Sequence, residues 1–133
     1  MRSVYDNVKA AVSLRPQAIT ANTNGIGVDT LGYNSAAVSL ETGAVTGTTP
    51  TLDVKIQDSA DNSTFADLAT PVAFTQITAA NNSQILRLEG LNATGRRRYI
   101  RAVATVGGTT PNFTSSCVVL LGRAYRGGSA VNP

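Results

Sequence analysis

The feature that most constrains the fold is the alternation of side chains in residues 51–58. The apolar positions are Leu52, Val54 and Ile56, and the positions between them are polar. Because successive side chains of a strand point to opposite faces, this pattern predicts a strand with one face in a core and the other in water. Residues 65–68 are expected to form the return strand of a hairpin.

Further β-type runs follow at intervals along the chain, with turn residues between them. The expected strands are residues 17–21, 36–41, 72–77, 84–88, 99–106 and 115–122. Residues 42–50 are expected to be a loop, and the clusters rich in Gly, Asn and Pro at 80–83, 92–95 and 107–112 are expected to separate strands. About eight short strands without helical crossovers predict an all-β fold, an antiparallel β-sandwich of jelly-roll-like type. Periodicity alone does not separate a sandwich from a jelly roll or a barrel.

The chain of 133 residues fits one domain. We expect an N-terminal arm at residues 1–17, the sandwich at 18–126 and a flexible tail at 127–133. Ser3 and Asp6 form a capping-box pattern ahead of valines and alanines at helical spacing, and Pro16 would end a helix. A helix this short is marginal by itself, so the arm is expected to be either a short helix or an extended strand. Removing residues 1–15 is expected to leave the sandwich folded.

Three aspartates, Asp58, Asp61 and Asp67, surround the predicted hairpin turn. An EF-hand loop would need ligands at alternate positions with Gly and Glu at set places, and the spacing here does not match, although an irregular cation site at the turn remains an alternative. A glycosidase pair would need two acids flanking a cleft. The favoured interpretation is backbone chemistry, because Asp and Asn bond their own backbone and tolerate left-handed conformations, as Asp61-Asn62 would here.

The residue inventory disfavours an enzyme. Histidine is absent, which removes the commonest general base and metal ligand. Cys117 lies in an apolar run and is expected to be a small core residue, and Gly25-Ile26-Gly27 is expected to be a turn and not a nucleotide loop. No catalytic, cofactor-binding or metal-binding residues are predicted. No run is long enough for a membrane helix and the N-terminus lacks a signal-peptide hydrophobic region, so no membrane partner is expected.

Charge is sparse and unevenly placed. Only 14% of residues are charged, and residues 1–89 carry five basic and eight acidic side chains whereas residues 90–133 carry six arginines and no acid. Folding either keeps these charges apart, which would steer docking, or interleaves them. Four arginines within residues 96–101 favour a protein interface or intramolecular pairing. Nucleic-acid binding is disfavoured because few aromatic residues accompany them, and a solvated turn is the third alternative.

Five segments carry a family resemblance: SVYDNVKAAVSLRPQAIT at the N-terminus, the G-x-G-V-D-x-x-G-Y-x-S-A pattern of residues 25–36, VKIQDSADNSTFADL, GRRRYIRAVATV, and VVLLGRAY. Together they resemble the small β-sandwich structural proteins of tailed bacteriophages, and within that group the head decoration (cement) proteins of jelly-roll type. The resemblance spans nearly the whole chain.

The resemblance implies a virion protein, made in the host cytoplasm, that binds the capsid exterior and clamps neighbouring capsomers. Its partners would be the major capsid protein and further copies of itself in a homotrimer, with the N-terminal arm against the shell. The candidate interface residues are Arg2, Val4, Tyr5, Val8, Arg15, Arg96, Arg97 and Arg98. The alternatives are a tail, neck or fibre protein, and a carbohydrate-binding module, which the scarcity of aromatic residues disfavours.

Overall fold

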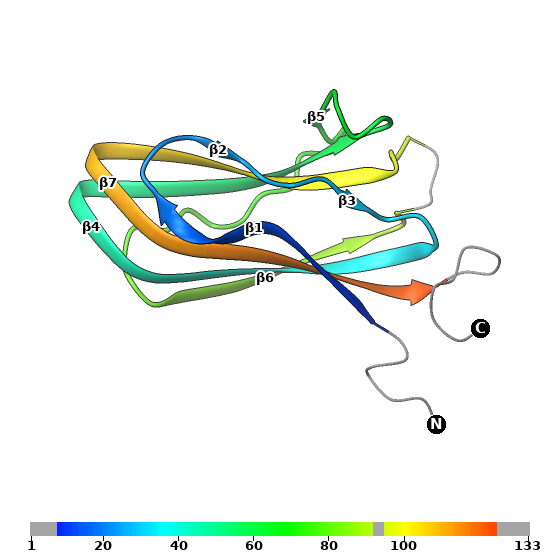
Figure 1. The fold of residues 1–133 in the computed structure, drawn as a ribbon, viewed down its shortest axis with the longest axis horizontal. Coiled ribbons are helices and arrows are strands. Elements are labelled where there is room, and N and C mark those ends of the chain that lie inside the picture. Colours follow the sequence, from blue (N-terminus) through cyan, green and yellow to red (C-terminus); the bar gives the residue numbers. More distant parts are fainter. Residues whose placement is uncertain (1–7, 92–94, 125–133) are drawn as a thin grey trace.

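The computed structural model describes residues 8–91 and 95–124, and these residues form an all-β, antiparallel fold without helices, which confirms the predicted fold class (Figure 1). Within the described ranges the chain forms seven strands. They are β1 (Lys9–Ile19), β2 (Thr23–Asn24), β3 (Val28–Asp29), β4 (Tyr33–Ser59), β5 (Ala66–Asp67), β6 (Asn82–Glu89) and β7 (Tyr99–Ala124). Two of them are far longer than expected: β4 has 27 residues and β7 has 26.

Strands β4 and β7 form one long antiparallel ribbon that folds over on itself. They pair along their length, from Tyr33 opposite Ala124 to Ser59 opposite Tyr99. Figure 1 shows both ribbons bending together near their middle, so that the sheet makes two layers. The first layer has the order β1, second half of β7, first half of β4, β6. The second layer contains β2 and β3, the first half of β7, the second half of β4, and β5.

The bend lies where loops were expected, at residues 42–50 and 107–112, and that prediction is wrong. Both segments remain paired to each other, with register shifts between Thr42 and Thr51. Gly47, Thr49, Gly108 and Thr110 have φ values of 118°, 46°, 97° and 46°. Such left-handed residues turn the chain sharply, and the ladder resumes on the far side of each shift. Glycine and threonine therefore produce a corner within the ribbon, not a break between strands.

The core lies between the two layers. Its most fully buried apolar side chains are Leu14, Ile19, Tyr33, Val38, Leu40, Leu52, Val54, Ile77, Ala102, Ala104, Phe113, Cys117, Val119 and Leu121. The alternation in residues 51–58 is confirmed, because Leu52, Val54 and Ile56 are buried and the polar residues between them reach solvent.

Residues 9–17, expected in an arm, belong to the sandwich. Strand β1 pairs with β7, with Val12 opposite Val118, and Leu14 is only 1% exposed. These residues were expected to form either a short helix or an extended strand, and the strand is found. Pairing with β7 provides hydrogen-bond partners for their backbone N–H and C=O groups, whereas a short isolated helix is only marginally stable. Removing residues 1–15 would take away most of this strand and the buried Leu14, so contrary to the sequence-based prediction we expect that deletion to destabilise the sandwich. Residues 1–7 and the expected tail at 127–133 lie outside the described residues.

The hairpin after residue 51 is confirmed, since Gln57 pairs with Asp67 and Asp58 with Ala66. Residues 72–77 do not form the expected strand and make only two isolated bridges to β4, at Leu52 and Lys55. The described residues contain no helix of the length and apolarity needed to cross a membrane.

Candidate interaction surface

The arginine segment before β7 is largely occupied by contacts within the chain. Arg98 donates from Nε and Nη2 to the two carboxylate oxygens of Asp29, at 2.8 and 2.7 Å, and its guanidinium lies 5.2 Å from the centre of the Tyr99 ring. These hydrogen bonds lower the pKa of Asp29 below its ordinary value. Arg97 lies 3.9 Å from Asp58. The charges of the two halves of the sequence are therefore interleaved at these arginines.

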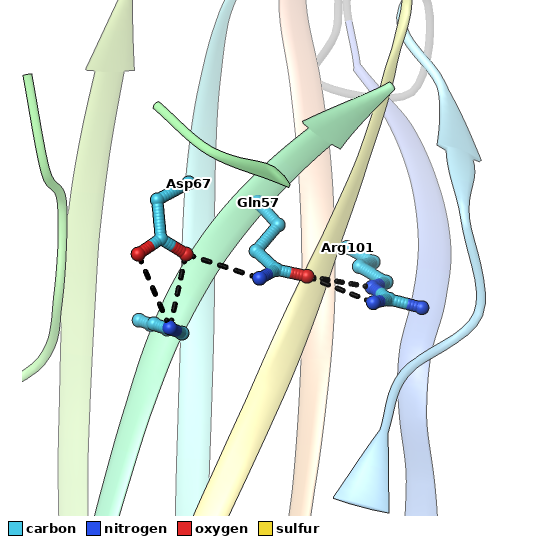
Figure 2. A network of polar contacts seen from close by, with 4 residues as sticks. Gln57, Asp67 and Arg101 are labelled. Atoms are coloured by element: carbon cyan, nitrogen blue, oxygen red, sulfur yellow. Dashed lines mark hydrogen bonds and ion pairs between the residues drawn. The ribbon is translucent and has the colours of Figure 1, made fainter. Parts of the chain in front are cut away.

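Arg101 also bonds to side chains of this chain, on the solvent-facing side of the second layer. Figure 2 shows its guanidinium donating to Gln57 Oε1, at 3.1 Å from Nε and 2.8 Å from Nη2, while Gln57 Nε2 donates to Asp67 at 3.0 Å. Lys55 lies 2.9 Å from Asp67. Hydrogen bonds from Gln57, and then from Lys55, lower the pKa of Asp67. The network ties β5 to β4 and β7.

The same contacts cover aromatic rings. The Arg101 guanidinium lies 4.2 Å from the centre of the Phe65 ring. Arg98 likewise lies over the Tyr99 ring, so each of the two rings has a guanidinium on one face.

The hairpin corner owes its shape to Asp61. Its Oδ1 accepts hydrogen bonds from the backbone N–H groups of Ser63 and Thr64, each at 2.9 Å, and from Ser59 Oγ at 2.9 Å. These bonds lower the pKa of Asp61 to about 2. Asn62 is left-handed, with φ of 60°. The predicted turn is confirmed. The described residues hold no cluster of three or more His, Cys, Asp or Glu side chains that could bind a metal ion.

Cys117 is fully buried, as predicted, in the layer formed by β1, β7 and β4. Burial raises the pKa of its thiol to about 12. A thiol held neutral in this way is a small apolar core group.

The predicted interface residues are not gathered in one place. Arg2, Val4 and Tyr5 lie outside the described residues. Arg15 is exposed on β1, whereas Arg96, Arg97 and Arg98 precede β7 at the edge of the second layer. Val8 is separated from these arginines and lies on the first layer, beside two exposed apolar side chains of β6 and β7.

Those two side chains, Ile85 and Leu120, mark a surface that contains only one of the predicted interface residues, Val8. Ile85 is 75% exposed and Leu120 is 37% exposed. The register places Ala10, Leu120 and Ala37 in one row across the outer face of the first layer. The next row contains Val12, Val118, Ser39 and Ile85. We call this the outer face.

A shallow groove of about 460 Å³ runs across the outer face. Apolar side chains of Val8, Ala37, Ile85 and Leu120 line it, and Arg87 and Glu89 form an ion pair at its rim with Nε and Oε2 3.0 Å apart. One sequence feature indicates this apolar face. The run Cys117-Val118-Val119-Leu120-Leu121 is apolar at every position, so this strand has no polar face to give to water.

No protein-family model matches the chain, and no curated protein is significantly similar to it in sequence. Among solved structures, one of infectious bursal disease virus, Gx strain, aligns with a TM-score of 0.57 and 8% identity, over 94% of this chain and 34% of that chain. This chain therefore spans about a third of the viral chain, and the likeness shows a shared fold.

Two further likenesses are weaker and add nothing to the assignment of the fold. The crystal structure of YomS, a protein derived from the SPBc2 prophage, aligns with a TM-score of 0.49 and 12% identity over 90% of this chain and 99% of that one. A structure of Bacillus endospore appendages, which are disulfide-linked pili, aligns with a TM-score of 0.41 and 14% identity, over 89% and 84% of the two chains.

Proposed function

We propose that this protein is a structural component of a phage virion that binds the outer surface of the capsid and holds neighbouring capsomers together. The observation that carries the proposal is the outer face of the first layer. There, exposed Ile85 and Leu120 flank an apolar groove. Such a face on a small protein is typical of a docking surface.

Two further observations support the role. The sandwich shares its fold with a chain of infectious bursal disease virus, and the sequence motifs resemble those of phage decoration proteins. Most of the polar side chains at the Asp61 hairpin and around Arg98 and Arg101 form hydrogen bonds or ion pairs with one another, which suits a rigid building block. The proposed role is not enzymatic, and its partners would be the major capsid protein and further copies of this chain, with a homotrimer as the expected assembly.

In this proposal the capsid surface covers the groove, and the N-terminal segment enters the contact beside Val8, which lines one end of the groove. Repeated weak contacts through several copies would add up by effective concentration. The clamp then resists expansion of the shell without any chemical step.

The test is cosedimentation of the purified protein with expanded phage heads that lack a decoration protein. We expect saturable binding by the wild-type protein and loss of binding by Leu120→Lys, which places a charge at the centre of the outer face. Ile26→Lys is the matched control, because Ile26 is also an exposed apolar residue but lies beside Ser13, at the β1 edge. Equal binding by wild type and Leu120→Lys, or no binding by the wild type, would count against the proposal.

Truncation separates the contribution of the N-terminal segment. Deleting residues 1–7 leaves β1 intact, whereas deleting residues 1–15 removes Ser13 and Leu14 from the interior. The shorter deletion is therefore the variant to use, and we expect it to weaken binding to heads while the thermal unfolding midpoint stays within a few degrees of wild type. Immunogold labelling of intact particles distinguishes a head position from one on the tail, neck or fibre.

A further inference from the structure

Strand β6 forms the free edge of the first layer. Among the residues that the structure describes, β6 pairs only with β4, in an unbroken register from Ser35 opposite Glu89 to Thr42 opposite Asn82. Exposed edges of this length are usually protected by proline, bulges or charged side chains. The sequence of β6, NSQILRLE, contains no proline, its ladder has no bulge, and its two charged residues, Arg87 and Glu89, are confined to one end.

The register fixes which backbone groups of β6 face outward. Asn81 N donates to Gly43 O at 2.9 Å just before the strand begins, and Asn81 is left-handed, with φ of 58°. A left-handed residue points its own N–H and that of the next residue to the same side, so the N–H of Asn82 also faces β4. Because hydrogen-bonded and non-hydrogen-bonded pairs alternate in an antiparallel ladder, the even-numbered residues of β6 bond to β4. The odd-numbered residues, which include Ser83, Ile85 and Arg87, turn their backbone N–H and C=O groups away from β4.

We propose that two copies of this protein associate through β6, in an antiparallel edge-to-edge pair centred on Ile85. In that register Ser83 lies opposite Arg87 of the second copy and Ile85 opposite Ile85. These three outward-facing residues of each strand form three hydrogen-bonded pairs, which makes about six backbone hydrogen bonds. The pairing joins the two first layers into one continuous sheet.

The side chains on the outer face match in the same register. Ile85 meets Ile85 of the second copy, so the most exposed apolar side chain of the described chain gains an apolar neighbour. Arg87 lies opposite Ser83 of the second copy, and Ser83 Oγ donates to Glu41 at 2.7 Å. The long Arg87 side chain thus reaches toward an acidic side chain at both ends of the interface. Across the two-fold axis the apolar Ile85 side chains contact each other, and each Arg87 faces Glu41 of the other copy.

The edge is also held in place before pairing. Gln84 donates from Nε2 to Thr75 O and accepts at Oε1 from Thr75 N, each at 2.9 Å, which anchors β6 to residues 72–77 on its inner side. A fixed edge loses less conformational freedom on association than a mobile one. The contact remains narrow, so association is expected to be concentration-dependent. The inference does not rest on the proposed function. A two-fold pair cannot form within a single three-fold ring, so the contacts of the expected homotrimer use other surfaces and β6 joins copies from two different trimers.

Covalent capture tests the register. In a hydrogen-bonded antiparallel pair the Cα atoms are about 5.5 Å apart, within disulfide range. We expect Ile85→Cys to form a disulfide-linked dimer in mild oxidant. Ser83→Cys is the matched control on the same strand and face, because its copies would be separated by about 13 Å along the strands. The native Cys117 is buried and does not interfere. Equal cross-linking of both variants, or none by Ile85→Cys, overturns the register.

Charge reversal tests the complementarity. By sedimentation equilibrium, Arg87→Glu should weaken association roughly tenfold, since it sets like charges together twice across the two-fold axis. Adding Glu41→Arg should restore it. Within one chain the two residues lie in different rows of the sheet, so only contact between copies explains the rescue. Failure of the double variant to recover, or association unaffected by Ile85→Lys, overturns the pairing. Head binding is a separate measurement, and either proposal can fail alone.

Discussion

The side-chain oxygen of Ser13 lies 2.9 Å from the backbone nitrogen of Ala102, although the two residues are 89 positions apart. Ser13 sits at the register shift of β1, in the first layer, whereas Ala102 belongs to the half of β7 in the second layer. The same hydroxyl donates to Ile26 O at 2.9 Å. One buried hydroxyl thus connects the two layers at the side where the sheet is open.

Ser13→Ala is expected to destabilise the fold by about 1–3 kcal/mol, because it leaves the Ala102 N–H and the Ile26 carbonyl without partners in the interior. Thr23→Ala is the control, since its hydroxyl bonds only to Ala21 O at an exposed position, and its effect should stay within about 0.5 kcal/mol. Urea unfolding followed by circular dichroism measures both. An unchanged midpoint for Ser13→Ala would show that the hydroxyl is dispensable.

Gly25→Ala tests how closely the segment after β2 approaches this junction. A Cβ atom at Gly25 would lie 2.5 Å from Ser13 Oγ and 2.6 Å from Ala102 O, so the neighbouring backbone must shift. We expect a loss of about 1–3 kcal/mol. At Gly43 the nearest atom would be 3.8 Å away, and Gly43→Ala should leave the stability unchanged or slightly raised. Similar values for the two variants would contradict the packing described.

The thiol of Cys117 should be unreactive in the folded protein. It is fully buried, and burial raises its pKa to about 12, so almost none is present as thiolate at pH 8. We expect no reaction with Ellman's reagent under native conditions and one equivalent in denaturant. Rapid labelling of the native protein would mean that the layer containing β1 opens readily.

The pH dependence of stability should carry the signature of Asp61. Its pKa of about 2 in the folded chain lies below the ordinary value of 3.8, so the stabilising effect is complete above about pH 4 and is lost as the pH falls toward 2. Asp29 and Asp67 have lowered pKa values and act in the same direction.

Asp61→Asn separates charge from geometry. An amide oxygen can still accept hydrogen bonds from Ser63 and Thr64, but it does not titrate in this range. The variant should therefore lose part of the stability decrease between pH 4 and 2, as measured by thermal unfolding at each pH. A decrease as steep as that of wild type would assign the effect to other carboxylates.

The alternation of polar and apolar residues was sufficient to predict a strand where one face of the strand is exposed to solvent and the other is buried. Residues 51–58 alternate between polar and apolar because Lys55 and Gln57 face solvent and form a hydrogen-bond network there, while Leu52 and Ile56 enter the core. The turn at Asp61 was equally predictable, since its hydrogen bonds are local.

Features that depend on distant partners were not predictable in this way. Glycine and proline at residues 42–50 indicate a change of direction. They do not show whether a strand 66 residues later turns with them, as Asn112 does opposite Thr46. Helical spacing before Pro16 was overridden by pairing with β7. Of the outer face only Val8 was predicted as an interface residue, because Val8, Leu120 and Ile85 become neighbours only through the sheet.

The folded-over ribbon of β4 and β7 also bears on how the chain reaches its native state. Partners in this ribbon are between 40 positions apart, at Ser59 and Tyr99, and 91 positions apart, at Tyr33 and Ala124. Contacts of such long range must close large loops before they contribute, and proteins of high contact order fold in milliseconds to seconds. The ends nearest in sequence, around Ser59 and Tyr99, have the smallest loop to close, so we expect the ribbon to nucleate there and to zip toward the chain termini.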